Sequence, residues 1–137
     1  MLTLIKNAKI VNEGEVYKGD VLIENQKIKK IDLDIKINAK KEINANGLYL
    51  FPGVIDDQVH FREPGLTHKG SIYTESKAAV AGGITSFMEM PNTNPQALTQ
   101  KILEKKYEIA AKTSLANYSF FMGASNDNLE EVLKTNP

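Results

Sequence analysis

The spacing of the apolar residues changes near residue 48, and this change constrains the fold more than any other feature of the sequence. Before it, short apolar runs alternate with polar residues at roughly period two, as in residues 27–31, which is typical of half-buried antiparallel strands. Asn12-Glu13-Gly14 and Asn25-Gln26 predict turns. Residues 35–43 continue the strand-like pattern until Asn44-Ala45-Asn46-Gly47 ends it. Residues 1–49 therefore predict part of a small β domain.

After residue 48 the sequence predicts strands that alternate with helices. The strand-like runs are residues 48–60 (with Pro52-Gly53 inside), 84–90 and 115–122. The predicted helix N-caps are Ser71, then Thr99 or the Asn94-Pro95 pair, then Asn126 or Asp127. This order predicts an α/β fold with a parallel sheet, about three βα units over residues 50–137. A closed (β/α)8 barrel takes ~250 residues. Periodicity therefore leaves open a small open α/β domain or the first part of a barrel.

Charge and composition exclude several classes of function. The 17 acidic and 17 basic residues cancel, which argues against a nucleic-acid-binding protein or a polybasic membrane-surface protein. The absence of cysteine leaves His, carboxylate, amide or water as metal ligands and fits a cytoplasmic protein. No apolar run approaches the ~20 residues that span a bilayer. Residues 1–11, interrupted by Lys6 and Lys9, are expected to be mature structure and not a signal peptide.

Polar residues concentrate towards the end of the strand predicted over residues 48–60. Side chains on a strand alternate between its two faces, so one polar and one apolar face are expected. The polar face would hold Asp56, Gln58, His60 and Arg62. The apolar face would hold Ile55, Val59 and Phe61. A buried polar row costs free energy unless its members bind a ligand, a metal or one another, which makes this segment a candidate site.

A second polar cluster, Met90-Pro91-Asn92-Thr93-Asn94-Pro95, follows the next predicted strand. Each cluster alone has an ordinary interpretation, because histidine and arginine commonly form surface contacts, and Pro and Asn form turns. Their shared position changes this interpretation. Both follow the carboxyl ends of successive parallel strands, where barrel active sites are built, so their side chains are expected to converge on one pocket.

Together these segments resemble the N-terminal portion of the dihydroorotase family, within the amidohydrolase superfamily. The most specific motifs are His60-Phe61-Arg62-Glu63-Pro64-Gly65 and the Met90–Pro95 cluster. The resemblance extends to the opening residues 4–11, to residues 19–24 and to Ala81-Gly82-Gly83-Ile84-Thr85, so it runs along the whole chain.

The resemblance implies a zinc-dependent (β/α)8 barrel with a small β-sandwich built from both chain ends, to which residues 1–49 would contribute. It implies reversible hydrolysis of the cyclic amide of dihydroorotate to N-carbamoyl-aspartate in pyrimidine synthesis, with one or two zinc ions polarising the carbonyl and activating water. His60 matches the second histidine of the family's His-x-His metal motif. Arg62 and Asn92 match residues that hold the substrate carboxylate. The remaining ligands and the catalytic aspartate are implied on later strands, so no catalytic residue is expected within residues 1–137.

Position 58 departs from the family, because Gln58 stands where the first histidine of His-x-His is expected. An amide oxygen is a poor zinc ligand compared with imidazole. A single-metal or shifted site with Gln58 holding water is favoured, because Arg62 and Asn92 are retained. The alternatives are ligation by Asp56 or Asp57, or a non-catalytic relative. His68, after the Pro64-Gly65 turn, is expected to be a solvent or substrate-loop residue and not a ligand.

Several functions compete with the dihydroorotase interpretation. Allantoinases and hydantoinases are related cyclic amidohydrolases that typically lack an arginine matching Arg62. A non-catalytic, dihydroorotase-like subunit that scaffolds aspartate transcarbamoylase is kept open by Gln58, and a free-standing α/β binding module is a third possibility. Residues 1–137 alone are expected to be inactive and to associate, as a homo-oligomer or through the unclosed barrel. The expected partner is the small-molecule substrate, not nucleic acid or membrane.

Overall fold

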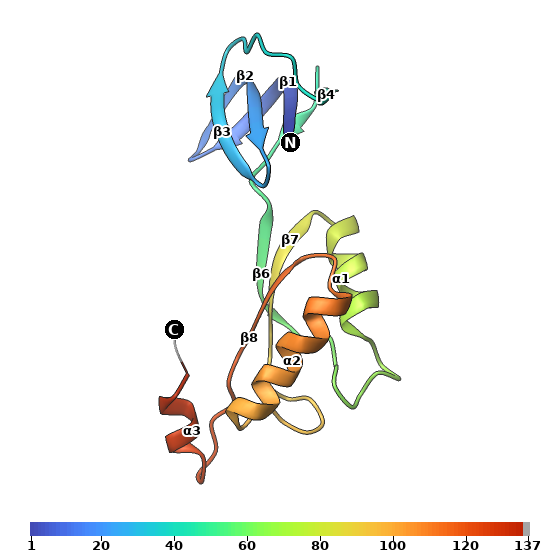
Figure 1. The fold of residues 1–137 in the computed structure, drawn as a ribbon, viewed down its shortest axis with the longest axis vertical. Helices are drawn as coiled ribbons and strands as arrows, with labels where there is room; N and C mark the ends of the chain where they lie inside the picture. The colour runs from blue at the N-terminus through green and yellow to red at the C-terminus, as the bar shows by residue number, and fades with distance from the viewer. Residues whose placement is uncertain (136–137) are drawn as a thin grey trace. The chain divides into compact units, whose positions relative to one another are not determined.

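The computed structural model describes residues 1–135, which divide into two compact units that meet between Pro52 and Gly53 (Figure 1). The division lies slightly beyond the expected boundary after residue 49, because a short strand at residues 49–50 pairs within the first unit. The run predicted over residues 48–60 is therefore two strands in two units, separated at Pro52-Gly53. Residues 136–137 of the predicted second domain lie outside the described residues.

The first unit is a single five-stranded sheet in the order β3-β2-β1-β4, with β5 paired to β1. Its strands are β1 (Leu2–Asn12), β2 (Glu15–Glu24), β3 (Lys27–Asp32), β4 (Lys41–Asn44) and β5 (Tyr49–Leu50). The antiparallel pairing predicted for the early strands is confirmed for β1, β2 and β3. It is wrong for β4, which runs parallel to β1, as β5 also does. Leu4, Ala8, Ile10 and Val21 are among the buried side chains of this unit.

A buried carboxylate binds the start of the strand expected over residues 35–43, of which only the part from Lys41 forms. Asp20 accepts hydrogen bonds from the backbone N–H of Ile35 (3.0 Å) and of Asn7 (2.8 Å). Burial by itself would raise the pKa of Asp20, but these donors and the Lys6 ammonium, 3.6 Å away, outweigh it, so the pKa is lowered. Ile35 thus gives its N–H to a side chain instead of a neighbouring strand, and regular structure resumes only at Lys41.

The second unit alternates strands and helices around a three-stranded parallel sheet in the order β6-β7-β8. Its elements are β6 (Val54–Val59), α1 (Ile72–Ala81), β7 (Ile84–Glu89), α2 (Gln100–Thr113), β8 (Asn117–Phe120) and α3 (Leu129–Leu133). The predicted N-caps Ser71 and Thr99 are confirmed, since each side chain accepts a backbone N–H of the first helical turn. The mixed α/β class is therefore observed.

The predicted N-cap at Asn126 or Asp127 is wrong, because α3 begins after Asn128. The Asn128 side chain does not cap the helix. Its amide donates to the carbonyl oxygens of Gly123 (2.8 Å) and Leu98 (2.9 Å), so it ties the loop after β8 to the segment before α2. Residues 126–128 are Asn, Asp and Asn, and all three types favour N-cap positions. Local preference alone therefore does not show which of them caps the helix and which makes a tertiary contact.

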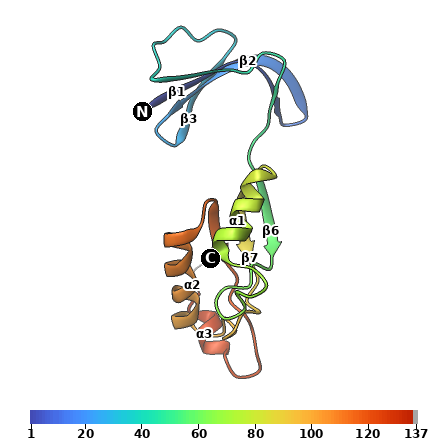
Figure 2. The same ribbon diagram turned by 90° about the vertical axis from the view of Figure 1, so that its right-hand side faces the viewer.

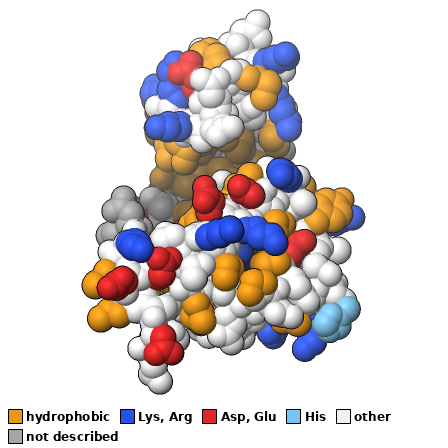
Figure 3. Space-filling model, turned by 60° about the horizontal axis from the view of Figure 1, so that its bottom comes forward, with side chains coloured by type: hydrophobic (Ala, Val, Ile, Leu, Met, Phe, Trp, Pro, Cys, Tyr) orange, Lys and Arg blue, Asp and Glu red, His pale blue; other side chains and the backbone are white. Residues whose placement is uncertain are grey.

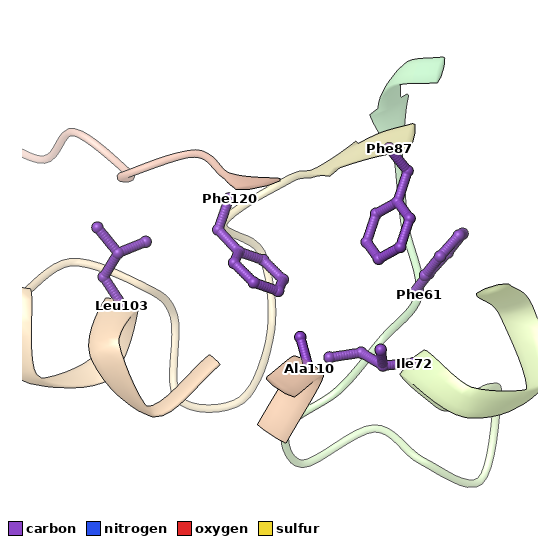
Figure 4. Close-up of a cluster of buried hydrophobic side chains, with 6 residues drawn as sticks. All are labelled: Phe61, Ile72, Phe87, Leu103, Ala110 and Phe120. Atoms are coloured by element: carbon purple, nitrogen blue, oxygen red, sulfur yellow. The ribbon is translucent and has the colours of Figure 1, made fainter. Parts of the chain in front are cut away.

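The core of the second unit lies between the sheet and helices α1 and α2, which lie on the same side of it (Figure 2). Its buried members converge in Figure 4: Phe61, Ile72, Phe87, Leu103, Ala110 and Phe120. The ring centroids of Phe61 and Phe87 are 4.4 Å apart. The side chain of Phe61, the residue after His60, therefore packs against the middle strand β7. Packing of Phe61 therefore anchors the segment that carries the first polar motif.

Acidic and basic side chains are interspersed on the face drawn in Figure 3, and neither sign gathers into a broad patch there. Within residues 1–135, no helix has the length and apolar character needed to cross a bilayer.

Candidate active site

The first polar motif is shaped by a β-bulge and by the early end of β6. Asp56 pairs with Phe87 and Val59 pairs with Glu89, so three steps along β6 match two along β7. A bulge of this kind changes the face that each side chain presents. Asp56 therefore lies opposite a residue of the helix-side core, and Arg62 lies beyond the strand's end. The expected single face holding Asp56, Gln58, His60 and Arg62 is wrong for this reason.

The structure brings two of the predicted site residues into direct contact. His60 Nδ1 and Asn92 Oδ1 are 2.9 Å apart, although these residues follow two different strands. Because an amide oxygen can only accept, His60 Nδ1 donates the hydrogen. A neutral His60 then carries its lone pair on Nε2, the arrangement that suits an imidazole for metal binding. Both side chains are exposed, so the atoms that remain available face solvent.

The two motifs are also packed together through their backbones. Asn94 N–H donates to the carbonyl oxygen of Pro64 at 3.1 Å. Gly65 has a φ of 81°, and a Cβ built on it would collide with the carbonyl oxygen of Asn94. Only glycine fits this close approach. The Glu63 carboxylate accepts the N–H of Ile72 at 2.8 Å, which fastens the same loop to the start of α1.

Arg62 occupies the left-handed region with a φ of 72°, which is uncommon for a residue other than glycine. Its side chain is half-buried, and within residues 1–135 no carboxylate forms an ion pair with it. Arg62 lies two residues after His60, but among the described residues no hydrogen bond joins its guanidinium to His60 or Asn92. The meeting of all three side chains in one cavity stays a prediction.

Gln58 is exposed, and it takes no part in the His60–Asn92 hydrogen bond. Together with Asp57, Met90 and Pro91 it lines an open depression of about 440 Å³ next to the loop after β8. The Asp56 carboxylate is engaged locally, since it accepts the N–H of Gln58 at 3.2 Å. Among residues 1–135, no three His, Asp or Glu side chains are grouped to hold a metal ion. Residues 1–135 thus fit a metal through the imidazole of His60 and do not form a complete site.

His68 lies in the loop between β6 and α1 and is exposed, the position that its place after Pro64-Gly65 predicts. No side-chain hydrogen bond connects it to His60 or Asn92 among the described residues. Its role as a solvent or substrate-loop residue stays a prediction.

Sequence reasoning missed a buried ion pair behind the site. Glu89 ends β7 and Lys106 lies on α2, and both are fully buried. Lys106 Nζ is 3.1 Å from Glu89 Oε2 and donates to the carbonyl oxygen of Met90 at 3.0 Å. Desolvation raises the pKa of Glu89 and lowers the pKa of Lys106, and the attraction between them opposes both changes. A signal was present, because Lys106 shares helical spacing with the buried residues Leu103 and Ala110.

Known proteins that resemble this chain in sequence include a dihydroorotase and an allantoinase. The sequence model of the family described as Dihydro-orotase-like matches residues 47–132. A dihydroorotase of Lactococcus lactis subsp. lactis is 45% identical over 119 residues, which cover 84% of this chain and 28% of that protein. An allantoinase of Solibacter usitatus is 38% identical over 130 residues, which cover 94% of this chain and 28% of that protein.

Among solved structures, an L-hydantoinase (dihydropyrimidinase) of Arthrobacter aurescens superposes with a TM-score of 0.93 at 29% sequence identity. The match covers 96% of this chain and 30% of that one. The chain therefore spans less than a third of the length of each of these relatives.

Proposed function

This chain belongs to the dihydroorotase-like family, and on that basis we propose that it forms the N-terminal part of a cyclic amidohydrolase. The proposed reaction is the reversible hydrolysis of dihydroorotate to N-carbamoyl-aspartate. The observation that carries the proposal is the His60–Asn92 hydrogen bond, which joins the two polar motifs at the carboxyl ends of neighbouring strands. A ligand held there would contact both motifs at once.

The presence of Arg62 favours a substrate that carries a carboxylate. It is the only arginine in the chain, since the other 16 of the 17 basic residues are lysines. A guanidinium presents a rigid fork that matches a carboxylate with two hydrogen bonds, which an ammonium cannot do. Allantoin and hydantoin carry no carboxylate, so an arginine at this position favours dihydroorotate over the substrates named by the allantoinase and hydantoinase relatives.

The chain's own side chains would bind and orient the substrate. Asn92 accepts from His60 through Oδ1, which leaves its Nδ2 hydrogens to donate to a substrate oxygen. Arg62 would pair with the carboxylate and fix the direction of the ring. A zinc ion, when bound, supplies polarisation of the amide carbonyl and an activated water. Of the residues in this chain, His60 would hold it through Nε2.

A closed (β/α)8 barrel, a β-sandwich completed by other parts of the chain, a place in pyrimidine synthesis and a cytoplasmic location belong to the same proposal. An exposed apolar side chain on the face of the sheet away from the helices supports the proposed barrel. Phe87 faces the helices, so its neighbour Ser86 and the paired Ile55 face the other way, and Ile55 is 66% exposed there. Further strands that close a barrel would cover this apolar side chain.

The test of the proposed function is an assay of the full-length protein with dihydroorotate, allantoin and hydantoin as separate substrates. We expect kcat/KM for dihydroorotate to exceed that for either neutral ring by at least about 100-fold, since two charge-assisted hydrogen bonds are at stake. A preference for a neutral ring would assign the chain to a related amidohydrolase. No turnover of any of the three would favour the non-catalytic, dihydroorotase-like subunit instead.

Gln58 predicts a reduced metal complement. We expect the zinc-loaded full-length protein to bind about one ion fewer per chain than a relative with His-x-His, because an amide oxygen binds zinc weakly. Gln58→His should raise the zinc content measured by mass spectrometry towards that of the relative. Gln26→His, in an exposed turn of the first unit, is the matched control and should leave the content unchanged. A full two-ion complement in the unmodified protein would contradict this expectation.

A further inference from the structure

The buried Glu89–Lys106 pair contacts both segments that form the candidate site. On one side, Lys106 Nζ donates to the carbonyl oxygen of Met90, two residues before Asn92. On the other, Glu89 pairs in the sheet with Val59, the last residue of β6. The backbone N–H groups of Phe61 and Arg62 lie near enough to the Glu89 carboxylate to act to lower its pKa, against the larger effect of burial, although neither N–H forms a hydrogen bond with it.

Stability alone does not account for this pair. Both side chains are fully buried, and neither Glu89 oxygen has a well-aligned hydrogen bond among the described residues. Replacing a buried ion pair by apolar groups of similar volume is often neutral or stabilising, whereas removing one partner leaves an unpaired charge and is strongly destabilising. By this rule the pair is not needed for stability, since apolar side chains at the same place would often serve as well.

The backbone that the pair contacts is itself unusual. Arg62 is in the left-handed region, where residues other than glycine are disfavoured by contact between Cβ and the carbonyl oxygen. A negative charge beside the N–H groups of two successive residues favours backbone conformations that keep both groups close to it. Such strained conformations persist where the surrounding structure determines them, and they concentrate at functional sites.

We propose that Glu89 and Lys106 form a positioning unit that holds the backbone at Arg62 and Met90, so that the Arg62 guanidinium and the Asn92 amide meet the substrate in a fixed relation. This inference rests on the proposed function, because it assigns Arg62 to the substrate carboxylate. Glu89 and Lys106 act through other residues and do not touch the substrate. The pair is kept for orientation at the site.

The experiment uses four variants of the full-length enzyme: Glu89→Gln, Lys106→Met, the two combined, and Arg62→Met combined with Glu89→Gln. We expect Glu89→Gln to reduce kcat/KM for dihydroorotate by about 100-fold, because misplacement of an orienting group by about 1 Å costs that much. The double variant Glu89→Gln/Lys106→Met should recover the melting temperature lost in Lys106→Met, since no unpaired charge remains, but should not recover kcat/KM.

The Arg62→Met background separates positioning from general damage. If Glu89 acts through Arg62, then Glu89→Gln should change kcat/KM by less than about threefold once Arg62 is absent, because the two effects are coupled. The proposal would be overturned if the losses in kcat/KM of Arg62→Met and Glu89→Gln simply multiplied in the combined variant. A normal kcat/KM in Glu89→Gln/Lys106→Met would also overturn it. Glu24→Gln, which removes an exposed ion pair with Lys29 in the first unit, is the matched control and should match the unmodified enzyme.

Amide hydrogen exchange at Phe61 and Arg62 gives a readout that does not depend on activity. We expect faster exchange of both amides in Glu89→Gln, with no change at Val21 in the core of the first unit. Unchanged exchange at both sites would contradict the positioning role. If the unmodified enzyme does not hydrolyse dihydroorotate, the proposed function fails, and the exchange experiment still decides whether the pair holds this backbone.

Discussion

Replacement of Arg62 by methionine in the full-length protein is expected to lower kcat/KM for dihydroorotate by roughly 1,000-fold. Two charge-assisted hydrogen bonds to a carboxylate are together worth about 4 kcal/mol, and each 1.4 kcal/mol corresponds to a factor of ten. Methionine keeps an unbranched chain but has neither charge nor donors. Steady-state kinetics over a range of dihydroorotate concentrations measure the effect, and most of it should appear as a raised KM if Arg62 binds substrate and transition state alike.

Arg62→Lys is the matched variant for this prediction. It keeps the positive charge and loses the planar fork, so an intermediate loss of roughly 10- to 100-fold is expected. Arg62 forms no ion pair with the other described residues, so neither variant breaks an internal salt bridge, and the melting temperature should change little. Equal activity of Arg62→Met and the unmodified protein would remove the carboxylate-binding role of this residue.

Phe87→Ala is expected to destabilise the second unit by about 3–5 kcal/mol, the usual cost of truncating a buried aromatic side chain. Phe87 is 1% exposed and contacts Phe61 and Tyr118 across the core, so the lost volume cannot be refilled without moving β6 or β8. Denaturant unfolding of the full-length protein, followed by two independent probes, measures the change.

Phe87→Leu is the matched control for this core prediction, since leucine retains most of the apolar volume and should cost less than half as much. The loss should be traced to packing, because the ring makes no hydrogen bond. A change below about 1 kcal/mol for Phe87→Ala would show that this cluster does not stabilise the unit.

Much of the second unit was predictable because its signals are local. Ser71 and Thr99 precede apolar periodic segments, and both proved to be the N-caps of α1 and α2. The contact between the two polar motifs was predictable from topology alone, since parallel neighbouring strands bring their carboxyl ends together. The His60–Asn92 hydrogen bond is an instance of that rule.

The features that sequence reasoning missed depend on contacts between distant segments. The bulge in β6 changes which side chains share a face, and nothing in residues 54–59 marks it. The parallel pairing of β4 with β1 and the hydrogen bond from Ile35 N–H to Asp20, fifteen positions away in the sequence, both join segments that no local pattern connects. The partner of Glu89, Lys106, lies on the next helix, so no local pattern around Glu89 indicates the ion pair.

The tight approach of Gly65 to the Asn94 carbonyl has a consequence for engineering substrate scope. With no room for even a methyl group between them, the loops at residues 60–65 and 90–95 behave as a single cassette. A loop transplanted alone from a relative would meet a neighbour shaped for a different backbone. Exchanges designed to accept new rings should therefore move both loops together and leave the glycine in place.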